Sequence, residues 1–252
     1  EIYLFAEIGP NSIKRIFNSI ERVFNVFYEK ECLIKENASW FYSLKAESRQ
    51  QELEKIIKNE NFSFLRKIYN EEFKVNNIKL PSLKQTFFAL KKELIRFEKN
   101  RPFHLGHGDL CFNNILVDPI FGSINLIDPK AEKHKFLDKY GLVDNFYDLS
   151  KLNHSIEGLY DSVVNDLFKL NIFDINNISF EIYQPKEYEF YSSFFREIIC
   201  QKRIKYEYLR LLTANLFLNM LPLHIDNKDR VIGLSLIGSI LSSEYSMNEI
   251  IL

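Results

Sequence analysis

The feature that most constrains the fold is an interruption of helical patterning near the middle of the chain. Two short apolar runs, 114–117 and 124–127, stand on either side of a turn at 118–122 that contains proline and glycine. Short runs joined by such a turn predict a β-hairpin. Loop 104–113 precedes the hairpin, so its polar residues are brought to the end where the two strands begin and finish.

Apolar residues recur at helical spacing over most of the remaining chain. Helices are predicted over the following segments, with breaks near Pro185 and Pro222: 12–30, 47–58, 83–97, 147–170, 188–221 and 228–250. A short buried strand is predicted at residues 2–8, where a Gly-Pro pair follows. Because no repeat, linker or clear domain boundary is visible, residues 1–252 are predicted to form one α+β domain, predominantly helical, with the hairpin at its centre.

Charge and cysteine content exclude several classes of protein. The chain has 33 Lys and Arg against 34 Asp and Glu, so its net charge of -1 gives no reason to expect nucleic acid or an anionic membrane as a partner. No apolar run is long enough to cross a bilayer. The cysteines, Cys32, Cys111 and Cys200, are widely spaced and predict neither a zinc knuckle nor a disulfide framework, which fits a cytoplasmic protein.

Three polar residues fall where the predicted hairpin opens. Asp109 follows Gly108 in a tight loop, Asn114 begins the first strand, and Asp128 ends the second. Because a hairpin brings its two ends together, we expect Asn114 and Asp128 to lie close in space, with Asp109 beside them. Taken singly, each residue could serve only a turn or a cap. Together they form the kind of oxygen ligand set that Mg²⁺ and phosphoryl transfer require.

The same residues resemble a known family. The sequence His-Gly-Asp at 107–109, with an asparagine at 114, a hairpin and then Ile-Asp at 127–128, resembles the catalytic and metal-binding segments of the aminoglycoside phosphotransferase and choline kinase family. These proteins are relatives of protein kinases. Residues 147–152 resemble the start of the helix that follows the metal-binding aspartate. The stretches 148–160 and 217–224 are similar to kinase-like proteins of bacterial capsule and surface-polysaccharide clusters.

The resemblance implies a function and a role for each residue. It implies ATP and Mg²⁺ as cofactors and a hydroxyl of a small molecule as acceptor, such as a sugar, an amino alcohol or a related surface-polysaccharide precursor. Asp109 would be the catalytic carboxylate. Asn114 and Asp128 would be the Mg²⁺ ligands. His107 would fix the loop, and Asp148 would anchor the loop backbone from the helix behind it.

Part of the family pattern is missing from the sequence. The family has an N-terminal lobe with a phosphate-covering loop and a phosphate-binding lysine, and neither can be assigned. Gly9 is the only glycine before Gly106. Residues 1–8 could be the last strand or hinge of a missing N-terminal lobe, so that the chain would be mainly a kinase-like C-terminal lobe. A family member with a shrunken N-terminal lobe is the alternative.

Two further positions bear on the class of protein. Cys111 stands where protein serine/threonine kinases carry a lysine, which favours a small-molecule kinase. Lys130 could touch a phosphate, although the lysine-rich stretch 130–139 is most simply a solvated surface. His104, His107 and Cys111 match no common zinc spacing. The rival to an enzyme is a pseudokinase-like module that binds a nucleotide or a partner protein without catalysis.

Overall fold

The computed structural model describes residues 9–28, 34–118, 120–130, 141–243 and 247. The chain divides into two compact units. The first unit comprises Glu1–Asn37, Asn100–Glu157 and Pro185–Leu209, and the second comprises Ala38–Lys99, Gly158–Gln184 and Arg210–Leu252. The chain passes repeatedly from one unit to the other, which explains why no linker composition reveals them in the sequence.

The first unit contains the predicted hairpin. Its helices are α2 (Pro10–Tyr28), α6 (Asn145–Ile156), α8 (Tyr188–Gln201) and the start of α9 (Tyr206–Met220). An antiparallel sheet has the order β1 (Ile34–Glu36), β4 (Arg101–Leu105) and β7 (Leu142–Asp144). The short helix η2 (Phe112–Asn114) leads into the hairpin of β5 (Ile115–Val117) and β6 (Ile124–Leu126).

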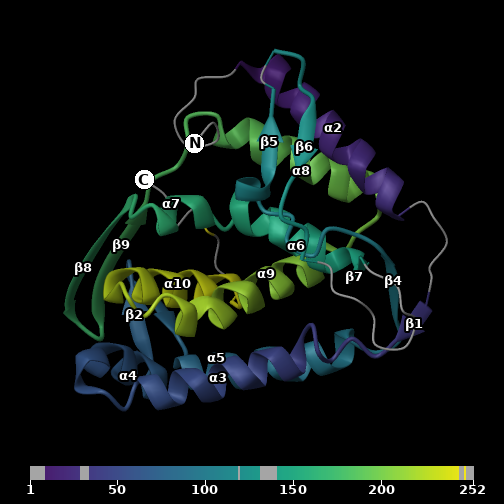
Figure 1. Ribbon diagram of the computed structural model, residues 1–252. Coiled ribbons are helices and arrows are strands. Elements are labelled where there is room, and N and C mark those ends of the chain that lie inside the picture. Colours follow the sequence, from purple (N-terminus) through teal and green to yellow (C-terminus); the bar gives the residue numbers. More distant parts are fainter. Residues whose placement is uncertain (1–8, 29–33, 119, 131–140, 244–246, 248–252) are drawn as a thin grey trace. The chain divides into compact units, whose positions relative to one another are not determined.

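Helix α2 supports both α8 and the hairpin (Figure 1). Its buried residues recur at helical spacing, and Phe17 packs edge-on against Tyr191 of α8, with ring centroids 5.9 Å apart. The Ser19 hydroxyl donates to the Gly122 carbonyl at 2.7 Å. Gly122 has φ of 70°, and a Cβ there would lie 2.5 Å from the Cβ of Arg15, so the turn requires glycine to reach the helix.

Helix α6 starts at a fixed point on the sheet. Asp144 caps the helix by accepting from the Phe146 amide, and its carboxylate binds the Arg101 guanidinium of β4 at 2.7 and 3.1 Å. Asp144 is fully buried, so this two-point contact supplies the partners that a buried charge needs. The start of α6 is thereby held against the strand that leads into loop 106–111.

The second unit combines helices with a four-stranded sheet. Its helical elements are α3 (Ser43–Ile56), η1 (Glu60–Phe62), α4 (Ser63–Asn70), α5 (Leu83–Phe97), α7 (Tyr160–Val164), η3 (Leu221–Leu223), α10 (Lys228–Leu241) and most of α9. The sheet has the order β3 (Ile78–Leu80), β2 (Phe73–Val75), β9 (Asn177–Ile182) and β8 (Phe168–Asp174). Figure 1 shows α3 and α5 side by side within this unit.

Helix α10 is buried from Val231 to Leu241. A helix that is apolar all round belongs either in a core or in a membrane. With 14 residues it is shorter than the ~20 residues that a membrane span needs. Across the described parts of the chain, no helix combines the length and the apolar character of a span.

The α+β prediction is confirmed, as are the hairpin and the helices at α2, α3, α5, α8 and α10. The helix predicted at 147–170 is interrupted after Ile156, because Gly158 and the left-handed Leu159 (φ 53°) stop α6. The short helix α7 follows at Tyr160–Val164, and the prediction is wrong from Phe168, where a strand begins. The helix predicted at 188–221 divides at the left-handed Arg203 (φ 54°), and the last helix ends at Leu241. The predicted strand at 2–8 lies outside the described residues.

The described part of the chain contains two further hairpins that the sequence did not predict. Strands β2 and β3 are joined by Asn76 and Asn77, both with positive φ, and β8 pairs with β9 from Phe168 to Asp174. Paired asparagines tolerate the left-handed turn that such a hairpin needs. Strand β9 alternates buried residues with partly or fully exposed ones, which is the pattern of a strand with one face on the core.

Candidate functional site

The loop before the hairpin is fixed to helix α6 by Asp148. The Asp148 carboxylate accepts hydrogen bonds from the backbone N–H groups of His107 at 2.7 Å and Gly108 at 2.8 Å. Asp148 is fully buried in the first turn of α6, where a negative charge is favoured by the helix dipole. Gly108 has φ of 79°, a conformation that glycine adopts without steric cost. The backbone beside Asp109 is therefore set by a buried carboxylate on a helix.

His107 joins the loop to the residue that follows the second strand, at the open end of the hairpin. Its Nδ1 accepts from the Asp109 N–H at 3.3 Å, and its Nε2 lies 2.9 Å from the Ile127 carbonyl oxygen. This pairing assigns the proton to Nε2, which donates to Ile127. The His107 carbonyl in turn accepts from the Lys130 N–H at 2.8 Å. The buried His107 side chain thus holds both sides of the site in register.

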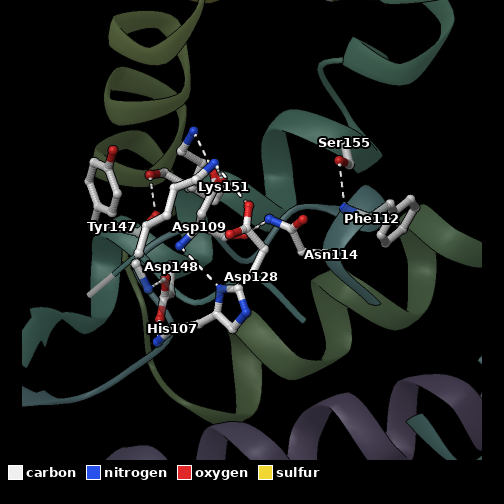
Figure 2. Close-up of polar contacts among 12 residues, drawn as sticks. His107, Asp109, Phe112, Asn114, Asp128, Tyr147, Asp148, Lys151 and Ser155 are labelled. Carbon is white, nitrogen blue, oxygen red and sulfur yellow. Dashed lines mark hydrogen bonds and ion pairs between the residues drawn. The ribbon is translucent and has the colours of Figure 1, made fainter. Parts of the chain in front are cut away.

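Asn114 is oriented by the same loop. Its side-chain Nδ2 donates to the backbone carbonyl of Asp109 at 2.8 Å, and its backbone carbonyl accepts from the Ile127 N–H at 3.0 Å. The amide group is therefore fixed with its Oδ1 on the side away from the Asp109 backbone (Figure 2). Asn114 and Asp128, which follows Ile127, are brought together at the open end of the hairpin, as the sequence predicted.

Asp109 lies between two lysines. Its Oδ1 is 3.0 Å from Nζ of Lys151, and its Oδ2 is 2.7 Å from Nζ of Lys130. Lys130 also reaches Oδ2 of Asp128 at 3.4 Å, so one ammonium bridges both carboxylates. The side chains of Asp109 and Lys151 are 11% and 17% exposed, whereas those of Lys130 and Asp128 are 58% and 64% exposed. One lysine is enclosed by the fold and the other is open to solvent.

The charges at this site stabilise one another. Burial raises the pKa of Asp109, but the ammonium groups of Lys151 and Lys130 outweigh burial and lower it to about 2. Burial lowers the pKa of Lys151, but the side chain of Tyr147 and the carboxylate of Asp109 outweigh burial and raise it above the ordinary lysine value. At neutral pH Asp109 is a carboxylate and Lys151 an ammonium ion.

Asp128 has an unusual backbone conformation. Its φ is 53°, in the left-handed region that few non-glycine residues occupy, although aspartate tolerates it better than most. Such conformations cost ~1–3 kcal/mol and are found preferentially at functional sites. The conformation places the Asp128 carboxylate within reach of the ammonium that contacts Asp109.

The residues present fit a weakly held, hard cation better than a dedicated metal cage. In the part of the chain that the structure describes, no group of three or more His, Cys, Asp or Glu side chains could hold a metal ion. A Mg²⁺ ion here would take Oδ1 of Asn114, the Asp128 carboxylate, and phosphate and water oxygens for the remainder. That is the usual composition of a Mg²⁺ site in phosphoryl-transfer proteins.

The sequence analysis did not identify Lys151 and Ser155 as site residues. It interpreted Lys130 mainly as part of a solvated surface. Ser155 accepts from the Phe112 N–H at 3.1 Å, and Asp148, Lys151 and Ser155 each contact loop 107–112. These three residues recur at the spacing of one helix face. A polar stripe on an otherwise buried helix was therefore the signal available in the sequence. Lys130 gives no comparable signal, because its pairing depends on the bend at Asp128.

Comparison with known proteins identifies no relative of this chain. No family model matches the chain, and no curated protein or solved structure matches it either. The resemblance to kinase-like families therefore stays a prediction, and function is inferred from the loop and its contacts.

Proposed function

We propose that this chain belongs to an ATP- and Mg²⁺-dependent phosphotransferase that phosphorylates a hydroxyl group of a small molecule. The observation that carries the proposal is the enclosed carboxylate of Asp109, fixed beside Asn114 and Asp128 at the open end of a hairpin. Phosphoryl transfer needs an acceptor-orienting carboxylate, oxygen ligands for the cation and fixed positive charge. Asp109, the pair Asn114 and Asp128, and the two lysines would supply these three elements in turn.

Asp109 would bind and orient the acceptor hydroxyl. The low pKa of Asp109 makes it a weak base but keeps it charged, so that it always accepts a hydrogen bond. Phosphoryl transfer passes through a loose transition state, in which positioning of the nucleophile contributes more than early removal of its proton. A strongly ionised carboxylate held by Asp148 and His107 through the loop suits that role.

Asn114 and Asp128 would hold Mg²⁺, which neutralises charge on the nucleotide phosphates when bound. Binding of the cation requires Lys130 to leave Asp128 and Asp109. Lys130 is 58% exposed, so its ammonium can return to water at small cost. The exposed lysine is thus a replaceable partner of the two carboxylates.

We extend the proposal to the fold and the acceptor. A helix whose first-turn aspartate binds the backbone of the preceding loop supports a kinase-like C-terminal lobe built around the hairpin. Sugars, amino alcohols and related surface-polysaccharide precursors are proposed as acceptors, because of the resemblance of residues 148–160 and 217–224 to kinase-like proteins of such gene clusters.

A second candidate function is a nucleotide- or protein-binding module without catalysis. The bridging of Asp109 and Asp128 by Lys130 favours it, because Lys130 and Lys151 together already balance the charge of the two carboxylates. In that case Lys130 would be a permanent part of the site, and neither carboxylate would be free to bind Mg²⁺.

A screen for phosphotransfer separates the two functions. The full-length protein is incubated with Mg·ATP and a panel of sugars, amino alcohols and aminoglycosides, and ADP formation is followed. We expect at least one acceptor to stimulate ADP formation, and Asp109→Asn to reduce that stimulation by ~10²–10⁴-fold. Asp118→Asn is the matched control, because Asp118 caps the hairpin turn through one oxygen that asparagine retains. ADP formation that no acceptor stimulates, or that is unchanged in Asp109→Asn, would favour the binding module.

A further inference from the structure

Lys151 is an ammonium group enclosed beside the candidate catalytic carboxylate. It lies on α6, its side chain is 17% exposed, and its Nζ is 3.0 Å from Oδ1 of Asp109. Lysine is seldom enclosed to this degree unless it is paired, because desolvation of the ammonium is costly. An apolar residue of similar length would fill the same space without that cost, so the charge at this position needs an explanation.

Neutralisation of Asp109 does not explain Lys151. Lys130 already lies 2.7 Å from the other oxygen of Asp109. A single ammonium would be enough to balance a single carboxylate, and the more exposed lysine supplies it at lower desolvation cost. Lys130 also contacts Asp128, so the two lysines balance the two carboxylates, and a divalent cation in place of Lys130 would leave the site with a net positive charge beside Lys151.

The position of Lys151 is fixed from two sides. On the same face of α6, Asp148 binds the loop before Asp109 and Ser155 binds the Phe112 N–H after it (Figure 2). The ammonium of Lys151 contacts the loop between these two anchors. Lys130, in contrast, follows the strained Asp128 and is largely in solvent. When a cation and phosphates enter the site, Lys130 can leave, whereas Lys151 stays.

We propose that Lys151 is the fixed cation of the transfer site, which holds Asp109 and contacts the oxygens of the transferring γ-phosphoryl group. This assignment rests on the proposed function. In the step concerned, the bond between the γ-phosphorus and its bridging oxygen breaks, and the electron pair leaves with ADP. The acceptor oxygen bonds to the phosphorus, and its proton passes to Asp109 and then to solvent. Lys151 remains protonated and makes its strongest contact in the transition state, where charge is spread over the equatorial oxygens of the transferring group.

The test compares nucleotides with and without a γ-phosphoryl group. Using the full-length protein, hydrolysis of Mg·ATP with water as acceptor gives kcat and KM, and calorimetry gives the Kd of Mg·ADP alone and with aluminium fluoride, which mimics the transferring group. For Lys151→Met we expect kcat to fall by ~10²–10³-fold, the loss typical for one electrostatic donor. Affinity for Mg·ADP with aluminium fluoride should fall in parallel, while the Kd of Mg·ADP alone stays within about twofold.

Two further variants separate charge from structure. Lys151→Arg should recover at least about tenfold of the kcat lost in Lys151→Met, because it restores the positive charge. Lys14→Met is the control for loss of a helical lysine, since Lys14 is exposed on α2 of the same unit, and it should match the unaltered protein. If circular dichroism shows that Lys151→Met does not fold, Lys151→Gln is measured in the same assays instead.

The outcomes are distinguishable. If the unaltered protein neither hydrolyses Mg·ATP nor binds it, the proposed function is wrong and the assignment of Lys151 is wrong with it. If the unaltered protein is active but Lys151→Met keeps kcat within about threefold, only the assignment of Lys151 is overturned. A loss of Mg·ADP affinity as large as the loss in kcat would assign Lys151 to the structure of the loop and likewise overturn the proposal.

Discussion

Asp109→Asn should destabilise the protein through Lys151, and a double-mutant cycle measures how much. Removal of one partner from a fully buried ion pair typically costs ~3–5 kcal/mol. Lys151 is 17% exposed and Lys130 can turn to solvent, so we reduce the expected loss in the free energy of unfolding to ~2 kcal/mol. Lys151→Met alone should cost less than ~1 kcal/mol, because Asp109 keeps Lys130 as a partner.

The coupling between the two residues is the informative quantity. In the Lys151→Met background, Asp109→Asn no longer leaves an enclosed ammonium without its carboxylate. The expected coupling free energy between the two substitutions is therefore ~1–2 kcal/mol. Urea unfolding followed by circular dichroism at neutral pH gives the four free energies, with Asp118→Asn as the control for the exchange of Asp for Asn. Additive effects within ~0.3 kcal/mol would refute the claim that Lys151 is enclosed and depends on Asp109.

The pH dependence gives the same cycle an internal check. The pKa of Asp109 is lowered in the folded protein, to about 2, so its charge contributes stability above the pKa of the unfolded chain and loses it as the pH falls through the folded value. The stability difference between the unaltered protein and Asp109→Asn should therefore be constant above pH ~5 and shrink below pH ~4. A difference that persists undiminished near pH 2 would mean that the carboxylate charge is not its source.

Three further substitutions test the supports of the site and the fold. Asp148→Asn should lower the free energy of unfolding by at least ~2 kcal/mol and speed hydrogen exchange at the loop amides, because an amide group presents only one oxygen to two N–H donors; unchanged exchange would contradict the anchoring. Gly122→Ala should cost ~1–3 kcal/mol in urea unfolding, since its Cβ would meet Arg15 at 2.5 Å, whereas Gly9→Ala, with open space around it, should cost less than ~0.5 kcal/mol; equal effects would contradict the contact with α2. Ser82→Ala should cost ~1 kcal/mol in the same assay through loss of the capping box at the start of α5, and no change would show that the cap is dispensable.

Part of the site was accessible from the sequence because hairpin geometry determines which residues are neighbours. The two apolar runs and their turn predicted that Asn114 and Asp128 would meet, and the pairing of Ile115 with Leu126 brings that about. The contact of Asp148 with the loop followed from the resemblance alone. No local sequence pattern predicts that a carboxylate on a later helix accepts hydrogen bonds from the N–H groups of His107 and Gly108.

Other parts could not be predicted because they depend on tertiary contacts. Strands β2 and β3 have three residues each, too few for alternation to outweigh the helical patterns around them. Phe168 to Leu170 fits a helix as well as a strand until its pairing with β9 is known. The role of Lys130 depends on the left-handed conformation of Asp128, which aspartate allows but does not require.

The contrast between Asp109→Asn and Asp128→Asn tests the central claim most directly. In the full-length protein, nucleotide affinity is measured by calorimetry with and without Mg²⁺, and phosphotransfer is measured in parallel. Asp109→Asn should nearly abolish transfer and leave Mg²⁺-dependent nucleotide affinity largely intact, because Asp109 would face the acceptor. Asp128→Asn should weaken both, because Asp128 would bind the cation. Equal effects of the two substitutions on affinity, or full transfer activity in both, would contradict the division of roles on which the proposed phosphotransferase depends.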